Sequence, residues 1–158
     1  MSEIKIKGET VLVDDDLVPM IKLFSWQIDS RAHRTTKYAS TFVYLGGKPT
    51  HLSMHRLITG MRKRAVDHIN GNGLDNRREN LRFCTNAQNV ANRRGFRTSS
   101  NKYKGVQKMP HGKWQAKIKV NGVSKYLGTF DTEELAAKAY DVAAKELYGK
   151  FAKPNFPT

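Results

Sequence analysis

The sequence predicts an α+β protein built from two small units, and three of its features favour this fold class. Short aromatic and β-branched runs separated by polar turns fill much of residues 24–60, as is typical of small antiparallel strands. The segment GKWQAKIKV alternates between apolar and polar residues, and a segment with helical spacing follows from residue 131. We expect an N-terminal domain at residues 1–96 and, at residues 97–158, a three-stranded antiparallel sheet packed on one helix.

The N-terminal domain begins with an acidic stretch. Residues 1–30 contain three lysines and six acidic residues, so we expect them to form a scaffold that does not face a polyanion. Strand-like runs follow in FSWQIDS, KYASTFVYLGG and THLSMHRLITG, and residues 55–59 are expected to begin a short helix.

A basic segment without acids joins the two domains. The sequence NVANRRGFRTSSNKYK has five basic residues together with the glycine and serine content of a linker. We place the boundary near Arg97 and expect Arg93 and Arg94 to follow a groove or the phosphate backbone of a nucleic acid.

The C-terminal domain carries the clearest secondary-structure pattern. Alternation directs Trp114, Ala116 and Ile118 to one face of a strand and Lys117 and Lys119 to the other. The Asn-Gly pair in VNGV predicts a tight turn into SKYLGTF, and YKGVQK supplies a third strand.

The helix that covers this sheet is predicted from DTEELAAKAYDVAAKELYG. Asp131 followed by Glu134 fits an N-cap and its capping-box acid. The face toward the sheet is expected to consist of Leu135, Ala139, Ala143 and Leu147.

The charge of the chain indicates a nucleic acid as partner. Twenty-eight Lys and Arg against fourteen Asp and Glu leave a net charge of +14, more than solubility requires. Residues 102–125 contain seven lysines and no acid, whereas residues 131–146 contain five acids. The sheet is therefore expected to face DNA, and an RNA-binding role is disfavoured because the sheet lacks the paired aromatics of an RRM.

The C-terminal segment resembles a known DNA-binding domain. YKGVQKMPHGKWQAKIKV, YLGTFDTEELAAKAYDVAAKELYGK and the closing NFP are similar to the plant Apetala/ethylene-response-factor (AP2/ERF) domain. The resemblance implies a sheet that reads double-stranded DNA in the major groove, with family contact positions at Lys104, Gln107, Lys117, Lys119, Tyr126 and Thr129. Since Met109, His111 and Ser124 stand where the plant proteins usually carry Arg or Trp, the plant target sequence is not expected.

Several classes of function are disfavoured by composition. Cys84 is alone, so it makes no internal disulfide and offers no Cys-x-x-Cys zinc site; we expect a small packed side chain. The start MSEIKIKGETVLVDDD lacks the apolar core of a signal peptide, and no segment approaches membrane-spanning length. We expect a cytoplasmic protein without a membrane partner.

The stretch VDHINGNGLDNRRENL combines a candidate base with a candidate metal ligand. Neighbouring side chains on a strand point to opposite faces, so Asp67 can bind a cation while His68 faces a water. A hard divalent cation accepts carboxylate and amide oxygens, and Asn89 offers the amide. Asn80 is placed to hydrogen-bond backbone groups across the loop, although such asparagines and glycines often only make turns. The arginines suited to phosphates are Arg77, Arg78 and Arg82.

The longer stretch DHINGNGLDNRRENLRFCTNAQNVAN resembles the HNH nuclease family, in the phage homing-endonuclease branch where Asn commonly replaces the final His. With LSMHRLITG and the earlier strands, the likeness covers roughly residues 10–95. It implies a ββα-metal domain, a β-hairpin and a helix that hold one divalent ion per active centre. His68 matches the general base, Asp67 and Asn89 the metal ligands, and Asn80 the residue that orients the motif. The final Asn favours Mg²⁺ or Mn²⁺ over softer metals.

Together the two resemblances imply a free-standing homing endonuclease in a phage-infected bacterial cell, with no small-molecule substrate. One active centre per chain is expected to nick one strand per binding event; the sequence predicts no oligomeric state. The alternative is a DNA-binding regulator whose HNH part has become a scaffold, which four competent motif residues disfavour. His55, between apolar neighbours, is assigned a packing role.

Overall fold

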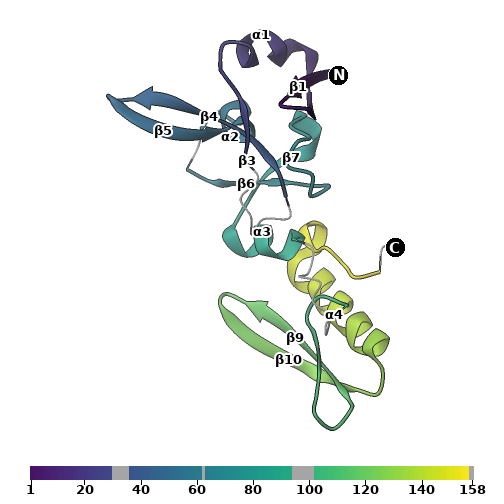
Figure 1. The fold of residues 1–158 in the computed structure, drawn as a ribbon. Helices are drawn as coiled ribbons and strands as arrows, with labels where there is room; N and C mark the ends of the chain where they lie inside the picture. Colours follow the sequence, from purple (N-terminus) through teal and green to yellow (C-terminus); the bar gives the residue numbers. More distant parts are fainter. Residues whose placement is uncertain (30–35, 62, 94–101, 157–158) are drawn as a thin grey trace. The chain divides into compact units, whose positions relative to one another are not determined.

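The computed structural model describes residues 1–29, 36–61, 63–93 and 102–156 of the chain. They group into two compact units, Met1–Cys84 and Thr85–Thr158, and each is described by itself (Figure 1). This grouping assigns residues 85–93 to the C-terminal unit, whereas the sequence predicts a boundary between residues 96 and 97. The predicted boundary near Arg97 and the predicted DNA contact Arg94 lie outside the described residues.

Three small antiparallel sheets make up the described part of the N-terminal unit: a β1-β2 hairpin, a β3-β4-β5 sheet and a β6-β7 hairpin. The strands and short helices in chain order are β1 (Ser2–Ile6), β2 (Glu9–Val13), η1 (Asp15–Leu17), α1 (Val18–Ile21), β3 (Gln27–Asp29), β4 (Tyr38–Leu45), β5 (Lys48–Ser53), α2 (Met54–Ile58), β6 (Ala65–His68), η2 (Arg78–Asn80) and β7 (Leu81–Cys84). The strands predicted before residue 54 and the short helix near His55 are confirmed.

The core of this unit gathers around the first hairpin and the start of α2. Val11, Val13, Ile21 and Met54 are fully buried, and Leu74 from the loop between β6 and β7 packs with them. The residues predicted to be scaffold thus supply much of the apolar surface on which the β6-β7 loop rests. Cys84, at the end of β7, is buried as predicted.

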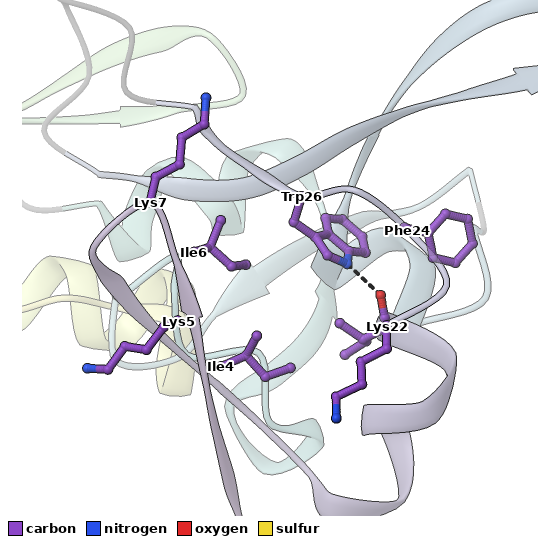
Figure 2. A pocket seen from close by; sticks show the side chains of 8 residues that line it. Ile4, Lys5, Ile6, Lys7, Lys22, Phe24 and Trp26 are labelled. Carbon is purple, nitrogen blue, oxygen red and sulfur yellow. Dashed lines mark hydrogen bonds between the residues drawn. The ribbon is translucent and has the colours of Figure 1, made fainter.

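A hollow lies beside the first hairpin (Figure 2). Ile4, Ile6 and Ile21 line it with Trp26, whose indole N–H donates to the carbonyl of Ile21 at 2.8 Å. None of the residues predicted for the active site lines this hollow. It is therefore a gap at the edge of the core and not the candidate site.

The C-terminal unit begins with a short helix and continues as a sheet covered by a long helix. Its elements are α3 (Asn86–Asn92), β8 (Val106–Lys108), β9 (Trp114–Val120), β10 (Val123–Phe130), α4 (Glu133–Tyr148) and η3 (Gly149–Phe151), and the strand order is β10-β9-β8. The α+β class is confirmed, as is the three-stranded antiparallel sheet on one helix (Figure 1).

The predicted alternation along β9 is present. Ala116 and Ile118 are 0% and 2% exposed and pack under α4, whereas Lys117 and Lys119 are exposed. The turn between β9 and β10 has positive φ at both Asn121 (49°) and Gly122 (88°), as the Asn-Gly pair predicts.

The N-cap of the predicted helix is wrong by one residue, and its predicted buried face is correct only in part. The N-cap is Thr132, whose hydroxyl accepts from the backbone N–H of Leu135 at 3.2 Å, while Asp131 pairs with Lys113. The buried face of α4 consists of Ala136, Ala137, Tyr140 and Ala144. Of the predicted face, Ala139 and Ala143 pack against the core at its edge. Leu135 and Leu147 are exposed, and Tyr140 is buried in their place.

Among the described residues, no helix combines the length and apolar character needed to cross a bilayer.

Candidate active site and DNA-binding surface

The Asp67–His68 pair ends strand β6, and both side chains are buried. They are 6% and 5% exposed, and they face Arg82 and Leu81 across the antiparallel β6-β7 pairing. The twelve residues between the two strands form a polar loop, which must be held by side-chain hydrogen bonds because little apolar surface is available to it.

Asn80 provides the hydrogen bonds across this loop that the sequence predicts. Its side-chain N–H donates to the carbonyl of Asp75 (2.8 Å), and its side-chain oxygen accepts from the backbone N–H of Asn70 (3.0 Å). The two asparagine side chains also meet at 3.1 Å. Both ends of the loop are thereby joined through one buried side chain.

The loop also pairs with the first hairpin. The N–H of Leu12 donates to the carbonyl of Leu74 (2.9 Å), and the N–H of Asn76 donates to the carbonyl of Leu12 (2.8 Å). At Gly73 a Cβ would lie 2.6 Å from the ring of Tyr38, so only glycine permits this approach. The sequence suggested a turn glycine there and missed this packing requirement.

His68 lies in a cluster of rings and amides. Its Nε2 is 3.3 Å from the side-chain oxygen of Asn76, and its ring centroid is 5.7 Å from Tyr38 and 5.0 Å from His55. With the amide oxygen accepting, Nε2 carries the proton and Nδ1 is the basic nitrogen. Burial lowers the pKa of His68 from 6.5, while the hydrogen bond with Asn76 and the charge of Asp67 oppose that shift. A neutral imidazole is favoured at neutral pH.

Asn76 and His55 both contact His68, and the sequence predicts neither contact. Asn76 is fully buried, and its side-chain nitrogen has no hydrogen-bond partner among the described residues. Burial lowers the pKa of His55 to about 3, so this ring is neutral as well. Its contacts with Tyr38 and His68 agree with the predicted packing role and extend it to the candidate base. No local motif in the sequence signals either contact.

Asp67 is paired with an arginine inside the same hairpin. Nε and Nη2 of Arg82 donate to one carboxylate oxygen of Asp67 at 2.9 and 2.8 Å. The guanidinium group that the sequence assigned to phosphate therefore also holds the candidate metal ligand in place.

The donor set fits a hard divalent ion by its chemistry. No group of three His, Cys, Asp or Glu side chains that could hold a metal occurs among the described residues. The carboxylate of Asp67 is a hard oxygen ligand, which suits an ion such as Mg²⁺ because that ion keeps several waters and binds substrate phosphates. Asn89 lies on α3 in the C-terminal unit, so the full ββα-metal arrangement belongs to the proposal below.

Two loop arginines are paired with carboxylates of their own unit. Arg77 donates to both side-chain oxygens of Asp75 at 2.8 Å, which lowers the pKa of that carboxyl group. Arg78 makes two bonds to Asp16, at 2.7 and 2.8 Å. The acidic start of the chain thus holds the loop, and phosphate contact by these arginines stays a prediction.

The open face of the C-terminal sheet gathers five of the predicted DNA contacts. Lys117 stands beside Tyr126, and Gln115 lies between Gln107 and Thr129 in the register of the three strands. A bulge between Tyr126 and Gly128 brings the hydroxyls of Tyr126 and Thr129 to 2.8 Å. The predicted contacts on this face are Gln107, Lys117, Lys119, Tyr126 and Thr129, all exposed.

Lys104 is placed differently from these five residues. Its ammonium group donates to the carbonyls of Val90, Ala91 and Arg93 at the end of α3. Arg93, the other described residue of the predicted linker contacts, is exposed.

Comparison with known proteins finds matches to both parts of the chain. An HNH endonuclease model matches residues 62–91, and an AP2 domain model matches residues 101–150. An uncharacterized HNH endonuclease of Acanthamoeba polyphaga mimivirus is 34% identical over 152 residues, which cover 94% of this chain and 76% of that protein. The chain belongs to the HNH endonuclease family.

Plant proteins also match this HNH endonuclease family member, over a smaller share of its length. An AP2/ERF and B3 domain-containing protein of Oryza sativa subsp. japonica is 50% identical over 58 residues, 37% of this chain and 16% of that protein. An ethylene-responsive transcription factor of Arabidopsis thaliana is 50% identical over 56 residues, 34% of this chain and 22% of that protein. Both predicted family resemblances are confirmed.

Proposed function

We propose that this protein is a metal-dependent DNA endonuclease in which His68 is the general base and the C-terminal sheet binds double-stranded DNA. The observation that carries the proposal is the buried, neutral His68 beside Asp67, in a loop joined by Asn80. Membership in the HNH family supports the same reaction class.

The reaction is hydrolysis of one phosphodiester bond. Nδ1 of neutral His68 accepts a proton from a water, and the oxygen of that water attacks phosphorus as the bond to the leaving 3′ oxygen breaks. The Asn76 side-chain oxygen keeps the proton on Nε2 and so directs the basic nitrogen to the water. Asn80 acts as a positioning residue because its hydrogen bonds fix the loop that returns to β7.

Asp67 and Asn89 would hold one divalent ion, Mg²⁺ or Mn²⁺. Such an ion, when bound, stabilises negative charge on the scissile phosphate and the leaving oxygen. Arg82 keeps the Asp67 carboxylate oriented through its two donated hydrogen bonds.

DNA is bound by the open face of the β10-β9-β8 sheet. Lys117 and Lys119 supply charge there, and Gln107, Tyr126 and Thr129 supply polar groups that can reach base edges or phosphates. The AP2 match supports DNA as the partner of this face. Lys104 is left out of the contact set because its ammonium group is bound to α3.

The test is incubation of the pure protein with supercoiled plasmid and phage DNA, in Mg²⁺, in Mn²⁺ and in chelator. We expect nicked circles in the presence of metal and none with chelator or with His68→Ala. Retained DNA binding without cleavage under every metal condition would favour the alternative, a DNA-binding regulator, and would overturn the proposal.

A further inference from the structure

The C-terminal end of α3 is held by a side chain from the AP2-like domain. The ammonium group of Lys104 donates to the carbonyls of Val90 (3.4 Å), Ala91 (2.5 Å) and Arg93 (2.9 Å). The backbone N–H of Lys153 also donates to the carbonyl of Ala91, at 3.3 Å. The last turn of α3 is therefore contacted by two later parts of the chain: Lys104, more than ten residues after the helix, and Lys153, about sixty residues after it.

α3 depends on such support because it has only seven residues. A helix of that length is not stable alone in water. Its N-terminus is closed by a capping box between Thr85 and Gln88. At the other end Arg93 is extended (φ −64°, ψ 142°), so no left-handed C-terminal cap satisfies the last carbonyls. The Lys104 ammonium supplies donors there and a charge that complements the helix dipole.

The backbone of Lys104 is itself fixed by the end of the domain. The side-chain oxygen of Asn155 accepts from the Lys104 N–H (2.7 Å), and its side-chain N–H donates to the Lys104 carbonyl (3.1 Å). Asn155 is in turn held by the carboxylate of Asp141 on α4. At the next residue, Gly105, a Cβ would collide with the ring of Tyr140. Lys104 is thus a rigid link between the sheet-and-helix core and α3.

Asn89 lies on α3 immediately before Val90, whose carbonyl is one of the three that Lys104 binds. The HNH match ends on this helix, at residue 91, and the AP2 match begins at residue 101. The last residue of the nuclease motif is therefore carried by the unit that contains the DNA-binding sheet.

We propose that Lys104 is a positioning residue of the nuclease: by holding the end of α3 it lets the DNA-binding unit present Asn89 as a metal ligand. The inference rests on the proposed function above. It replaces the DNA contact that the sequence predicts for Lys104 with a role in metal binding. Burial lowers the pKa of Lys104 to about 8, with Asp141 opposing, so the group is still charged at neutral pH. A partly buried ammonium is stabilised by such hydrogen bonds, and the three carbonyls provide them.

The experiment compares Lys104→Met, Lys104→Arg and a control, Lys138→Met, in the full-length chain. Lys138 is exposed on α4, so the control removes the same charge without disturbing α3. Mn²⁺ affinity is measured by electron paramagnetic resonance without DNA, and duplex affinity is measured in chelator. The rate of amide hydrogen exchange at residues 86–93 reports the stability of α3. Asp67→Ala and Asn89→Ala are measured alongside.

We expect Lys104→Met to weaken Mn²⁺ binding by about 10- to 100-fold, the usual effect of removing a group that supports a metal ligand. Exchange of α3 should become faster, Lys104→Arg should recover part of both losses, and duplex affinity should match that of Lys138→Met. Unchanged Mn²⁺ affinity in Lys104→Met alone, or a loss of duplex affinity beyond the control, would overturn the inference. If Asp67→Ala and Asn89→Ala also leave Mn²⁺ affinity unchanged, the proposed metal site itself is wrong and the inference falls with it.

Discussion

The two units use basic side chains in opposite ways. In the β6-β7 hairpin and its loop, Arg77, Arg78 and Arg82 are all paired with carboxylates of the same unit. On the sheet of the C-terminal unit, Lys117 and Lys119 are exposed on a strand without any acidic residue. The first arrangement holds the β6-β7 loop in shape, and the second leaves charge available to a polyanion.

This difference shows why net charge alone does not locate a DNA-binding surface. The loop is rich in arginine, but the acids that neutralise it stand either within the loop, as Asp75 does, or more than sixty positions away, as Asp16 does. Counting charges in a short stretch of sequence detects an acid within the loop, such as Asp75, but not a distant one, such as Asp16. The predictions below test whether the two sets of cations really differ in function.

The largest effect is expected at His68, the proposed general base of the N-terminal unit. His68→Ala should reduce the single-turnover rate of cleavage by about 10²- to 10⁴-fold, the usual contribution of a general base. Duplex affinity should be nearly unchanged, because the ring accepts a proton from water and contributes no charge. The check is a rate measured on a nicking substrate beside an anisotropy titration in chelator; near wild-type cleavage would remove His68 from the base role.

Much of the fold and of the site could be predicted from the sequence where the signal is local. The alternation of β9, the Asn-Gly turn and the cross-loop role of Asn80 depend on residues within about ten positions of one another. Features that depend on distant segments were missed, namely the pairing of Arg78 with Asp16 and the hydrogen bonds between the loop and Leu12. The contacts of His55 and Asn76 with His68 were also missed, although both residues are close to His68 in the chain, because no side-chain pattern marks them. The predicted buried face of α4 is correct for Ala139 and Ala143 and wrong for its two leucines. A neighbouring series of residues has the same helical spacing, and only packing against the sheet selects the series that contains Tyr140.

A second prediction concerns the pH dependence of stability in the N-terminal unit. His55 has a folded pKa of about 3, against 6.5 when unfolded, so the unfolded chain binds more protons between these two values. Stability is therefore complete above pH 6.5 and falls as the pH is lowered toward 3. At pH 5 the loss from His55 alone should be about 2 kcal/mol relative to pH 7.

The measurement is denaturant unfolding at pH 7 and pH 5, followed by NMR signals assigned to each unit. His55→Phe keeps a ring in the Tyr38–His68 cluster and should flatten the pH dependence of the N-terminal signals by about that amount. An equally steep decline in this variant would show that other groups govern acid unfolding.

A third prediction tests the exposed lysines of the sheet. Lys117→Ala combined with Lys119→Ala should weaken duplex binding and reduce the log–log salt slope by roughly 0.9 for each phosphate that the protein no longer neutralises. We expect Lys119→Ala alone to lower the affinity for all duplex sequences equally. For Lys117 the two outcomes are a uniform loss of affinity or a selective one of about 1–3 kcal/mol at one base position. Titration of cognate and scrambled duplexes at several salt concentrations decides this, and unchanged affinity in the double variant would remove the sheet from the interface.

The smallest effect on binding is expected at Arg78, which gives the sharpest test of the contrast between the two units. Its guanidinium group donates twice to Asp16, and its backbone N–H donates to the Asp14 side chain at 3.0 Å. The hydrogen bonds from Arg78 lower the pKa of Asp16, as expected for a stable pairing.

Arg78→Gln removes the cation but keeps the backbone hydrogen bond to Asp14. The change in the salt slope of duplex binding should therefore be well below the roughly 0.9 that corresponds to one neutralised phosphate. Stability should change little, because an exposed ion pair contributes little. The matched variant is Lys117→Gln, which removes one charge from the sheet. If Arg78→Gln lowers the salt slope as much as Lys117→Gln does, Arg78 must exchange its ion pair with Asp16 for a DNA phosphate. The arginines of the loop then belong to the DNA-binding surface, as the sequence predicts.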